Sequence, residues 1–498
     1  MTDPSRPASS DTVPLRPLAT SIDGRTFSFH ASLDDLLFRV GGYVVQVDGD
    51  DAWLGQVLTL ELGLIEVGPV ASTPGPELLA VRRVAAAVGT GATLGVGRPF
   101  HDVPLTPATE AQVNEWQQAS RSQGVALEVG QFANLTGVPA LIDPQGFDRH
   151  TFLCGQSGSG KTYSLGVILE HLLMDTELRL LVLDPNSDFV RLGSVRDGSE
   201  GPITDAYRDV AAGIEVRRSE SSGGLPLRIR ASELSPTSRA AMLHLDPVDD
   251  REEYAALAEL LEHDEAGRPL IGGIGELLTS ELPGARPLGL RAANLGVLDW
   301  GIWERGAGGS LHGRLLEDDW RCLVVDLGSL DTPEEQAVIA ESVLDTLWRH
   351  RRDRRPVLIV IDDAHNVCPQ VSESGVVALA TRHAVQIAAE GRKFGLHLLV
   401  STQRPQKVHD NVLSQCDNLV LMRMNSAADL AHLVESFSFV PPSMFDEARH
   451  FGLGEALIAG KVSPNPTLVR FGARISEEGG ADVVPVPGRD GLNDGNAS

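Results

Sequence analysis

The sequence predicts a mixed α/β protein whose core is a largely parallel sheet, with a small β-rich domain before it. Three observations lead to this expectation. A glycine-rich loop at 155–162 stands between a short apolar run and a helical stretch. After this loop, short and fully apolar runs alternate with helical segments, which is typical of a parallel sheet covered on both faces. Before it, strand-like runs are separated by glycines and turn residues.

The composition is that of a globular protein with an acidic surface. The chain has 498 residues, of which 42% are hydrophobic and 22% charged, so it is too long for a single core. Its formal net charge of −26 argues against a protein that coats nucleic acid with its whole surface, and any such contact must be a local basic patch. The cysteines lie far apart at Cys154, Cys322, Cys368 and Cys416, which favours reduced core residues in a cytosolic protein over zinc or disulfide sites. No apolar run has the length of a membrane span.

The N-terminal part is expected to be β-structure after a short leader. Residues 1–21 are rich in proline and serine and lack the basic-then-apolar order of a signal peptide, so we expect a disordered leader. Residues 22–100 are expected to form a small β-barrel, with a sandwich as the alternative. The runs 43–47 and 53–60 flank a turn signal at 48–51, which predicts a hairpin.

A connecting segment, 101–142, with one helical stretch near 109–122, leads into the core domain. The core domain is predicted to span 143–474, with a helical insertion at about 197–318 and a disordered acidic tail at 475–498. Its predicted strands are 178–183, 322–327, 357–361, 396–401 and 419–422, followed by a hairpin of 456–459 and 467–471. Within the insertion, 249–262 is expected to be a helix, because acidic residues stand at its start and apolar residues recur on one face.

The loop at 155–162 has the pattern of a phosphate-binding loop, and we call it the phosphate loop. It fits G-x-x-x-x-G-K-[ST] at every fixed position, as Gly155, Gln156, Ser157, Gly158, Ser159, Gly160, Lys161 and Thr162. Its glycines let successive N–H groups point at phosphate oxygens, and the following helix adds the positive end of its dipole. Lys161 is expected to reach the β- and γ-phosphates of a nucleotide, and the Thr162 hydroxyl to ligate Mg²⁺. A turn without a ligand is the weaker alternative, because the flanking strand and helix stand where phosphate binding requires them.

Two carboxylates end the apolar run 357–361, which is typical of a Walker B strand. Asp362 is expected to hold Mg²⁺, usually through a water, and Asp363 to orient or deprotonate the attacking water. Such acid pairs also occur as helix caps or on solvated loops. The matched phosphate loop favours the functional interpretation.

Two further polar residues are candidates for the same site. Gln403 follows the apolar run 396–401, and the C-terminal ends of parallel strands face one crevice, so a γ-phosphate sensor is expected, with a polar loop as the alternative. Arg392 could serve as an arginine finger, in cis or from a neighbouring subunit. Taken alone, its context favours a solvated helix end. The basic stretch 349–355 is likewise expected to be a solvated turn rather than a nucleic-acid patch.

Taken together, these motifs resemble the HerA branch of the FtsK/HerA superfamily of P-loop DNA translocases. The resemblance runs from about 143 to 474 and includes the phosphate loop, Asp184-Pro185, Asp362-Asp363-Ala364-His365-Asn366, Glu390-Gly391-Arg392-Lys393-Phe394-Gly395, Ser401-Thr402-Gln403-Arg404-Pro405 and Gly452-Leu453-Gly454-Glu455-Ala456. The predicted β-rich domain is similar to the small barrel that precedes the motor in this branch.

The resemblance implies a RecA-like ATPase that uses ATP and Mg²⁺ and works as a homohexameric ring on double-stranded DNA. It also implies a partner nuclease or antiphage effector, and a role for Arg392 as a finger in trans. The branch usually has glutamate where this chain has Asp363, which withdraws the carboxylate by about 1.5 Å, and a displacement of that order can slow a reaction about a hundredfold. Slow hydrolysis is therefore expected, with Asp363→Glu predicted to speed it.

Two other functions stay open at this stage. The first is a nucleotide-gated ring scaffold that regulates a partner effector with little translocation. The second is a pump for conjugative DNA or protein at a membrane, which the lack of a span makes the weaker candidate.

Overall fold

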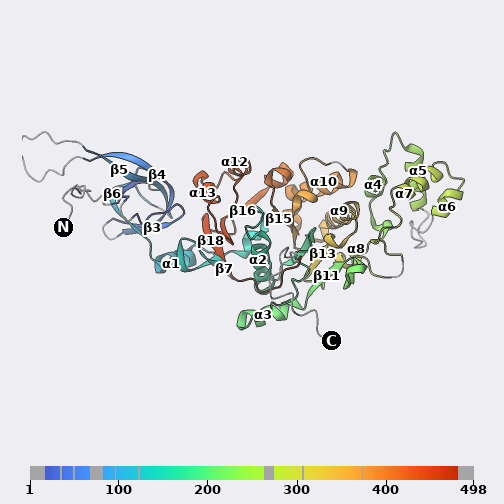
Figure 1. Ribbon diagram of the computed structural model, residues 1–498, viewed down its shortest axis with the longest axis horizontal. Coiled ribbons are helices and arrows are strands. Elements are labelled where there is room, and N and C mark those ends of the chain that lie inside the picture. The colour runs from blue at the N-terminus through green and yellow to red at the C-terminus, as the bar shows by residue number, and fades with distance from the viewer. Residues whose placement is uncertain are drawn as a thin grey trace, which may run out of the picture.

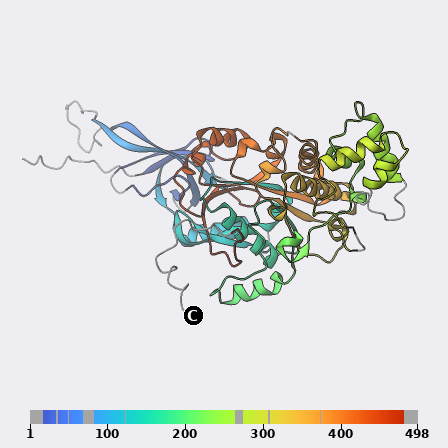
Figure 2. The ribbon, with the colours of Figure 1, turned by 45° about the vertical axis from the view of Figure 1, so that its right-hand side comes forward.

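The computed structural model describes residues 17–33, 36–48, 51–67, 82–95, 97–121, 124–262, 274–305, 308–372 and 374–480. A β-barrel occupies the N-terminal end of an elongated molecule, a large sheet with helices on both faces forms the middle, and a group of helices lies at the far end (Figure 1). A view turned by 45° shows the same three parts in line (Figure 2).

Six antiparallel strands form the N-terminal barrel, in the order β1-β2-β5-β4-β3-β6. They are β1 (Leu18–Ser21), β2 (Thr26–Ala31), β3 (Tyr43–Asp48), β4 (Asp51–Val67), β5 (Arg82–Leu94) and β6 (Phe100–Pro107). Alternate residues of β2 are buried, and the rings of Phe27 and Phe29 fill the interior. Glycines make room for these rings, because a Cβ on Gly91 would lie 2.1 Å from the Phe27 ring and one on Gly89 2.3 Å from the Phe29 ring.

The predicted hairpin is confirmed, since Asp48 pairs with Asp51, while residues 49 and 50 of its turn lie outside the described residues. The predicted leader is too long. Residues 18–21 form β1, whose pairing with β2 and β6 completes the barrel. The rest of the leader, residues 1–16, lies outside the described residues.

The connecting segment contains a capped helix and two strands of the large sheet. Helix α1 (Glu110–Ser120) is capped by Thr109, whose side chain forms a capping box with Gln112. Strands β7 (Leu127–Phe132) and β8 (Leu135–Ile142) then pair with each other, and β7 pairs with the last strand of the core. The sheet therefore begins before the predicted boundary at residue 143.

The core is a mixed, mostly parallel sheet, as predicted. In the described part of the chain it has 12 strands in the order β12-β11-β13-β10-β14-β15-β9-β16-β17-β18-β7-β8, of which β11 is Ile214–Arg218 and β12 is Leu225–Pro226. The pairs from β12 to β16 are parallel and those from β16 to β8 antiparallel. The central strands are β9 (His150–Cys154), β10 (Arg179–Asp184), β13 (Cys322–Asp326), β14 (Val357–Ile361), β15 (Leu396–Thr402) and β16 (Cys416–Met422), followed by the predicted hairpin of β17 (Glu455–Gly460) and β18 (Thr467–Phe471).

Helices cover both faces of this sheet, which is why its central strands are mostly apolar. On one face, α2 (Lys161–Asp175) packs on residues such as Leu153 and Val360. On the other face, α9 (Pro333–Arg349), α10 (Gly375–Glu390) and α12 (Ala427–Ser436) pack on residues such as Phe152 and Ile359. The short helices α11 (Asp410–Leu413) and α13 (Pro442–Glu447) join the same core. Cys154, Cys322, Cys368 and Cys416 are free and buried, and burial raises their thiol pKa values.

The predicted insertion is not purely helical. It adds β11 (Ile214–Arg218) and the short β12 (Leu225–Pro226) to the edge of the sheet, where β11 runs parallel to β13. Its helices are α3 (Pro202–Ala211), α4 (Pro236–Met242), α5 (Arg251–Glu262), α6 (Ile274–Thr279), α7 (Ala285–Asn294) and α8 (Leu311–Leu316). Helix α5 confirms the helix predicted at 249–262, and residues 263–273 lie outside the described residues.

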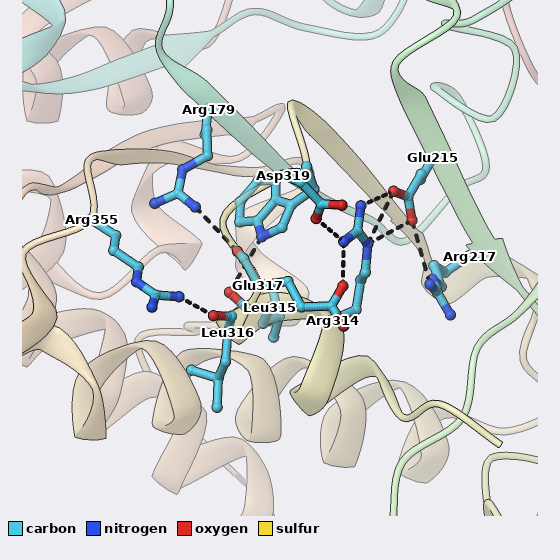
Figure 3. Close-up of polar contacts among 10 residues, drawn as sticks. Arg179, Glu215, Arg217, Arg314, Leu315, Leu316, Glu317, Asp319 and Arg355 are labelled. Atoms are coloured by element: carbon cyan, nitrogen blue, oxygen red, sulfur yellow. Dashed lines mark hydrogen bonds and ion pairs between the residues drawn. The ribbon is translucent and has the colours of Figure 1, made fainter. Parts of the chain in front are cut away.

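Charged side chains fasten the end of the insertion to the sheet (Figure 3). Arg314, on α8, bonds both carboxylate oxygens of Glu215 on β11 and also reaches Glu317 and Asp319. Arg355, just before β14, donates to the backbone carbonyl of Leu316 at the end of α8. These bonds use otherwise free groups at a helix end to hold α8 in place.

The start of the predicted disordered tail is ordered. Glu170 of α2 accepts bonds from the backbone N–H groups of Ile475 (2.9 Å) and Ser476 (2.7 Å), and both residues are buried. The core therefore extends beyond the predicted end at residue 474 and includes Ser476, and residues 481–498 lie outside the described residues. Within the described part of the chain, every helix is too short or too polar to cross a membrane.

Candidate nucleotide-binding site

The phosphate loop lies between β9 and α2, as predicted. Gly158 (φ 71°) and Gly160 (φ 91°) adopt left-handed backbone conformations, and Gly160 is the residue that caps the start of α2. Glycine is the residue best suited to such positions, because a Cβ strains them. A Cβ on Gly155 would in turn lie 2.7 Å from both Met422 and Ser159. The local sequence thus allows a tight loop that leads into the positive end of a helix dipole.

Neighbouring segments hold the phosphate loop from outside. Gln156 donates its backbone N–H to the carbonyl of Arg423 (2.9 Å), and the Arg423 guanidinium donates to the carbonyl of Gly158 (2.9 Å). The Gly454 N–H donates to the Ser159 carbonyl (3.1 Å), which brings the Gly452–Ala456 motif onto the loop. Sequence reasoning missed Arg423, although its place as the first residue after β16 was a signal, because strand ends at this edge surround the crevice.

Lys161 joins the phosphate loop to the Walker B strand. Its Nζ lies 2.5 Å from Asp362 Oδ1 and 3.4 Å from Asp363 Oδ1, and it donates to Ser401 Oγ at 3.0 Å. Burial disfavours the charged ammonium, but the two carboxylates outweigh it, so the pKa of Lys161 is raised. The structure therefore brings together Lys161, Asp362 and Asp363, as predicted, in a buried charge cluster.

The two acids differ in their surroundings. Asp362 is completely buried, and its second oxygen, Oδ2, has no hydrogen-bond partner in the described part of the chain. Asp363 has a left-handed backbone (φ 40°, ψ 49°), and its Oδ2 accepts a 2.6 Å bond from the side chain of Asn186. Each acid thus keeps one oxygen without a hydrogen bond to the described residues, Oδ2 in Asp362 and Oδ1 in Asp363, but only Asp363 is also held by a neighbouring amide.

Two further carboxyl groups lie near the site, that of Asp184 at the end of β10 and that of Asp188 four residues later. Asp184 accepts bonds from the N–H groups of Asp188 (2.9 Å) and Phe189 (2.8 Å), and burial raises its pKa to about 7. Burial and the nearby Asp362 raise the pKa of Asp188 to about 6. Asp188 lies 3.4 Å from the Thr162 hydroxyl. Sequence analysis singled out Asp184 only through the resemblance and missed Asp188.

These residues suit a Mg²⁺ ion bound together with a nucleotide. The free oxygen of Asp362, the Thr162 hydroxyl and the Asp188 carboxylate are hard oxygen ligands of the kind that Mg²⁺ prefers. No group of three or more His, Cys, Asp or Glu side chains with metal-binding geometry occurs among the described residues. The remaining ligands of an ion here would thus have to be phosphate oxygens and water.

Gln403 and Arg392 lie at opposite ends of β15. Gln403 follows the strand at the edge that carries Lys161, is partly exposed and forms no hydrogen bond to another described residue, so its amide is free for a ligand. Arg392 lies in the short helix η9 (Gly391–Phe394) before the strand, where it pairs with Asp417 at 2.7 Å. Because a strand of this length spans roughly 20 Å, Arg392 does not reach the phosphate loop of its own subunit. A finger in cis is therefore excluded in this conformation.

Comparison with known proteins confirms the resemblance to HerA. Residues 127–266 match the family described as "Helicase HerA, central domain". The DNA double-strand break repair helicase HerA of Pyrococcus furiosus is 33% identical over 116 residues, which cover 23% of this chain and 20% of that protein. The HerA of Sulfurisphaera tokodaii is 29% identical over 157 residues, covering 30% of this chain and 31% of the relative. The matches thus span less than a third of either relative's length.

Two solved structures are also similar. VirB4 of Thermoanaerobacter pseudethanolicus superposes with a TM-score of 0.47 at 18% identity, over 71% of this chain and 97% of that one. The bacterial conjugative coupling protein TrwB gives a TM-score of 0.48 at 13% identity, over 74% and 92% of the two chains.

Proposed function

Because the chain resembles helicase HerA through its central domain, we propose that it is a Mg²⁺-dependent ATPase with a RecA-like motor core. It acts as a homohexameric ring that translocates or remodels double-stranded DNA. The observation that carries this proposal is the 2.5 Å contact between Lys161 and Asp362, which assembles the phosphate loop and the Walker B strand into one site.

The residues of the site have distinct roles in this proposal. The phosphate loop and Lys161 bind the nucleotide phosphates, and Thr162 and Asp362 hold Mg²⁺, which neutralises charge on the transferred phosphoryl group. Lys161 must then exchange its carboxylate partners for phosphate. Asp363 orients or deprotonates the attacking water, and Gln403 senses the γ-phosphate through its free amide. Arg392 completes the site of a neighbouring subunit, since in its own subunit it lies at the end of β15 opposite to the phosphate loop.

A partner protein is part of this proposal. The curated HerA relatives are described as double-strand break repair helicases, and we infer a cytoplasmic ring that works with a nuclease or an antiphage effector. The second candidate is a nucleotide-gated scaffold for such an effector. It is favoured by the net charge of −26, which leaves few cations to hold DNA.

Turnover with and without linear duplex DNA, across a salt series, tests the motor. A net charge of −26 leaves few cations for a polyanion, so we expect weak binding through local contacts. Each phosphate contact contributes a slope of about −0.9 in log K against log salt, so stimulation should be present at low salt and fade as salt rises. Lys161→Ala should abolish turnover in every condition.

The controls separate ATPase activity from DNA translocation. Normal turnover by Lys161→Ala would refute the nucleotide-site assignment. Wild-type turnover that duplex DNA does not stimulate at the lowest salt at which the ring stays assembled, with or without the partner, would leave the scaffold as the better function.

A further inference from the structure

Within the described residues, two guanidinium groups contact the backbone of the phosphate loop: Arg474 donates to the carbonyl of Thr162 at the end of the loop (3.3 Å), and Arg423 lies at its bend. Its Nη2 donates to the carbonyl of Gly158 at 2.9 Å, while its own carbonyl accepts from the N–H of Gln156, also at 2.9 Å. The N–H of Asn425 donates to the side chain of Gln156 at 3.1 Å. The segment after β16 thus holds the loop at two of its residues.

The position of these bonds indicates how Arg423 acts. In a loop that cradles phosphate, the N–H groups point inward and the carbonyls outward. Arg423 bonds an outward carbonyl, at a residue whose left-handed backbone (φ 71°) forms the bend of the loop. The Gly158 carbonyl shares a peptide group with the N–H of Ser159. That N–H donates to the Gln156 carbonyl at 3.1 Å, so a charged donor on the Gly158 carbonyl polarises the peptide and strengthens the bond that closes the bend of the loop.

The loop's own cation, Lys161, is already paired with carboxylates. Lys161 is buried against Asp362 and Asp363, so the loop without nucleotide depends on groups other than Lys161 to keep its shape. A second outward carbonyl, that of Ser159, accepts from the backbone of Gly454. The Arg423 bond adds a side-chain donor to this outer support, and a substitution can remove it without altering the loop sequence.

We propose that Arg423 is a positioning residue for nucleotide binding, which acts through the phosphate loop and does not touch the nucleotide. This inference rests on the proposed ATPase function and adds a residue outside the phosphate loop and the Walker B strand. Because the loop holds phosphates that ATP and ADP share, Arg423 supports the binding of both nucleotides equally.

Calorimetric titration of the full chain with Mg-ATP and with Mg-ADP tests this. Arg423→Ala should weaken both affinities by the same factor, about tenfold or more, as expected for the loss of a charge-assisted hydrogen bond. KM for ATP should rise with kcat nearly unchanged, because uniform binding is lost. Arg423→Lys, which keeps a cation able to reach the carbonyl, should recover part of the affinity for both nucleotides.

The matched control is Arg449→Ala, which removes a partly exposed arginine paired with Asp446 at 3.8 Å and should leave both affinities unchanged. A loss confined to ATP would mean that Arg423 contacts the γ-phosphate and would overturn the positioning role, as would unchanged affinities in Arg423→Ala. If the alanine variant does not fold, the lysine variant decides by the same comparison of ATP with ADP. A wild-type chain that binds neither nucleotide refutes the ATPase proposal itself, which a failure confined to Arg423 does not.

Discussion

At the scale of single residues, Asp363 shows how the backbone changes the meaning of a substitution. Sequence comparison with the HerA branch suggested that its carboxylate is too short. The structure shows a left-handed backbone at this position and a 2.6 Å bond from Asn186. Aspartate tolerates left-handed conformations better than most residues. Aspartate thus fits the backbone conformation and the hydrogen bond at this position, and its shorter side chain need not lower activity.

Asp363→Glu should therefore slow ATP turnover, which reverses the expectation from sequence. The longer side chain loses the fit to Asn186 and strains the backbone, and a displaced catalytic carboxylate can lower the rate about a hundredfold. Steady-state turnover of purified wild type and variant decides this. Asp362→Asn should abolish hydrolysis and keep some nucleotide binding. A faster Asp363→Glu enzyme would show that the length of the acid outweighs its backbone fit.

His150 gives a second prediction, about pH. It is buried at the start of β9, its Nδ1 accepts the N–H of Leu398 at 2.9 Å, and burial, with nearby His397, Arg392 and Arg149, lowers its pKa to about 4. The folded pKa lies below the unfolded value of about 6.5, so His150 contributes stability above that value and the contribution is lost as pH falls through about 4.

His150→Asn, which keeps an acceptor but does not titrate, should lose less thermal stability than wild type between about pH 7 and about pH 4.5. Melting temperatures of both proteins across this range provide the measurement. If the melting temperatures of the two proteins fall equally with decreasing pH, groups other than His150 cause the loss of stability in acid.

At the scale of elements, β16 makes contacts at both of its ends that bear on nucleotide sites. Asp417, at its start, pairs with Arg392, and Arg423, just after its end, bonds the phosphate loop. One strand thus contacts both the nucleotide site of its own subunit and the arginine that we assign to a neighbour's site. A shift of β16 would therefore affect both sites together.

The elements also show what the sequence could predict. The central strands were predictable because burial on both faces leaves each of them with a continuous apolar run. Strand β11 was missed because it lies near the sheet edge and contains Glu215, Arg217 and Arg218, which form ion pairs. The end of the core was misplaced because it is held by long-range bonds to Glu170, which no local pattern reports.

The parts of the site that could be predicted from sequence are those that form continuous motifs along the chain. The phosphate loop and the acid pair are local patterns, and the structure joins Lys161 to Asp362 across the sheet. Arg423, Asp188 and Asn186 are single residues at strand ends, and only the strand order places them beside the loop.

Glu170 provides a stability prediction for the C-terminal segment. It lies in a buried pair with Arg474 (3.7 Å) and accepts two backbone bonds. Glu170→Ala should destabilise the core by about 3–5 kcal/mol, because it leaves a buried cation without its partner. Glu478→Ala, which removes a partly exposed partner of Arg196, should change stability by less than about 1 kcal/mol. Equal melting temperatures for Glu170→Ala and wild type would contradict the assigned role of the segment.

At the scale of the whole molecule, the position of Arg392 links catalysis to assembly. Lys161 lies at the C-terminal end of β15 and Arg392 before its N-terminal end. A single subunit therefore does not bring the two residues of the proposed site together. Head-to-tail contacts that close into a ring would place the surface around Arg392 in one subunit beside the phosphate loop of the next.

Mixing two inactive variants tests this arrangement. In rings made of Arg392→Ala and Lys161→Ala subunits, some interfaces combine an intact Lys161 with an intact Arg392 from the neighbour, so part of the ATPase activity should return. Each variant alone should be inactive, because every interface then lacks one of the two cations. Turnover is measured as a function of the mixing ratio, after subunit exchange has been verified with labelled protein, and a trans finger predicts a maximum at intermediate ratios. Mixed rings without activity would indicate that Arg392 serves only its bond to Asp417 or that turnover requires every site in the ring. A ring of Arg392→Ala subunits alone that keeps normal turnover would select the first of these explanations.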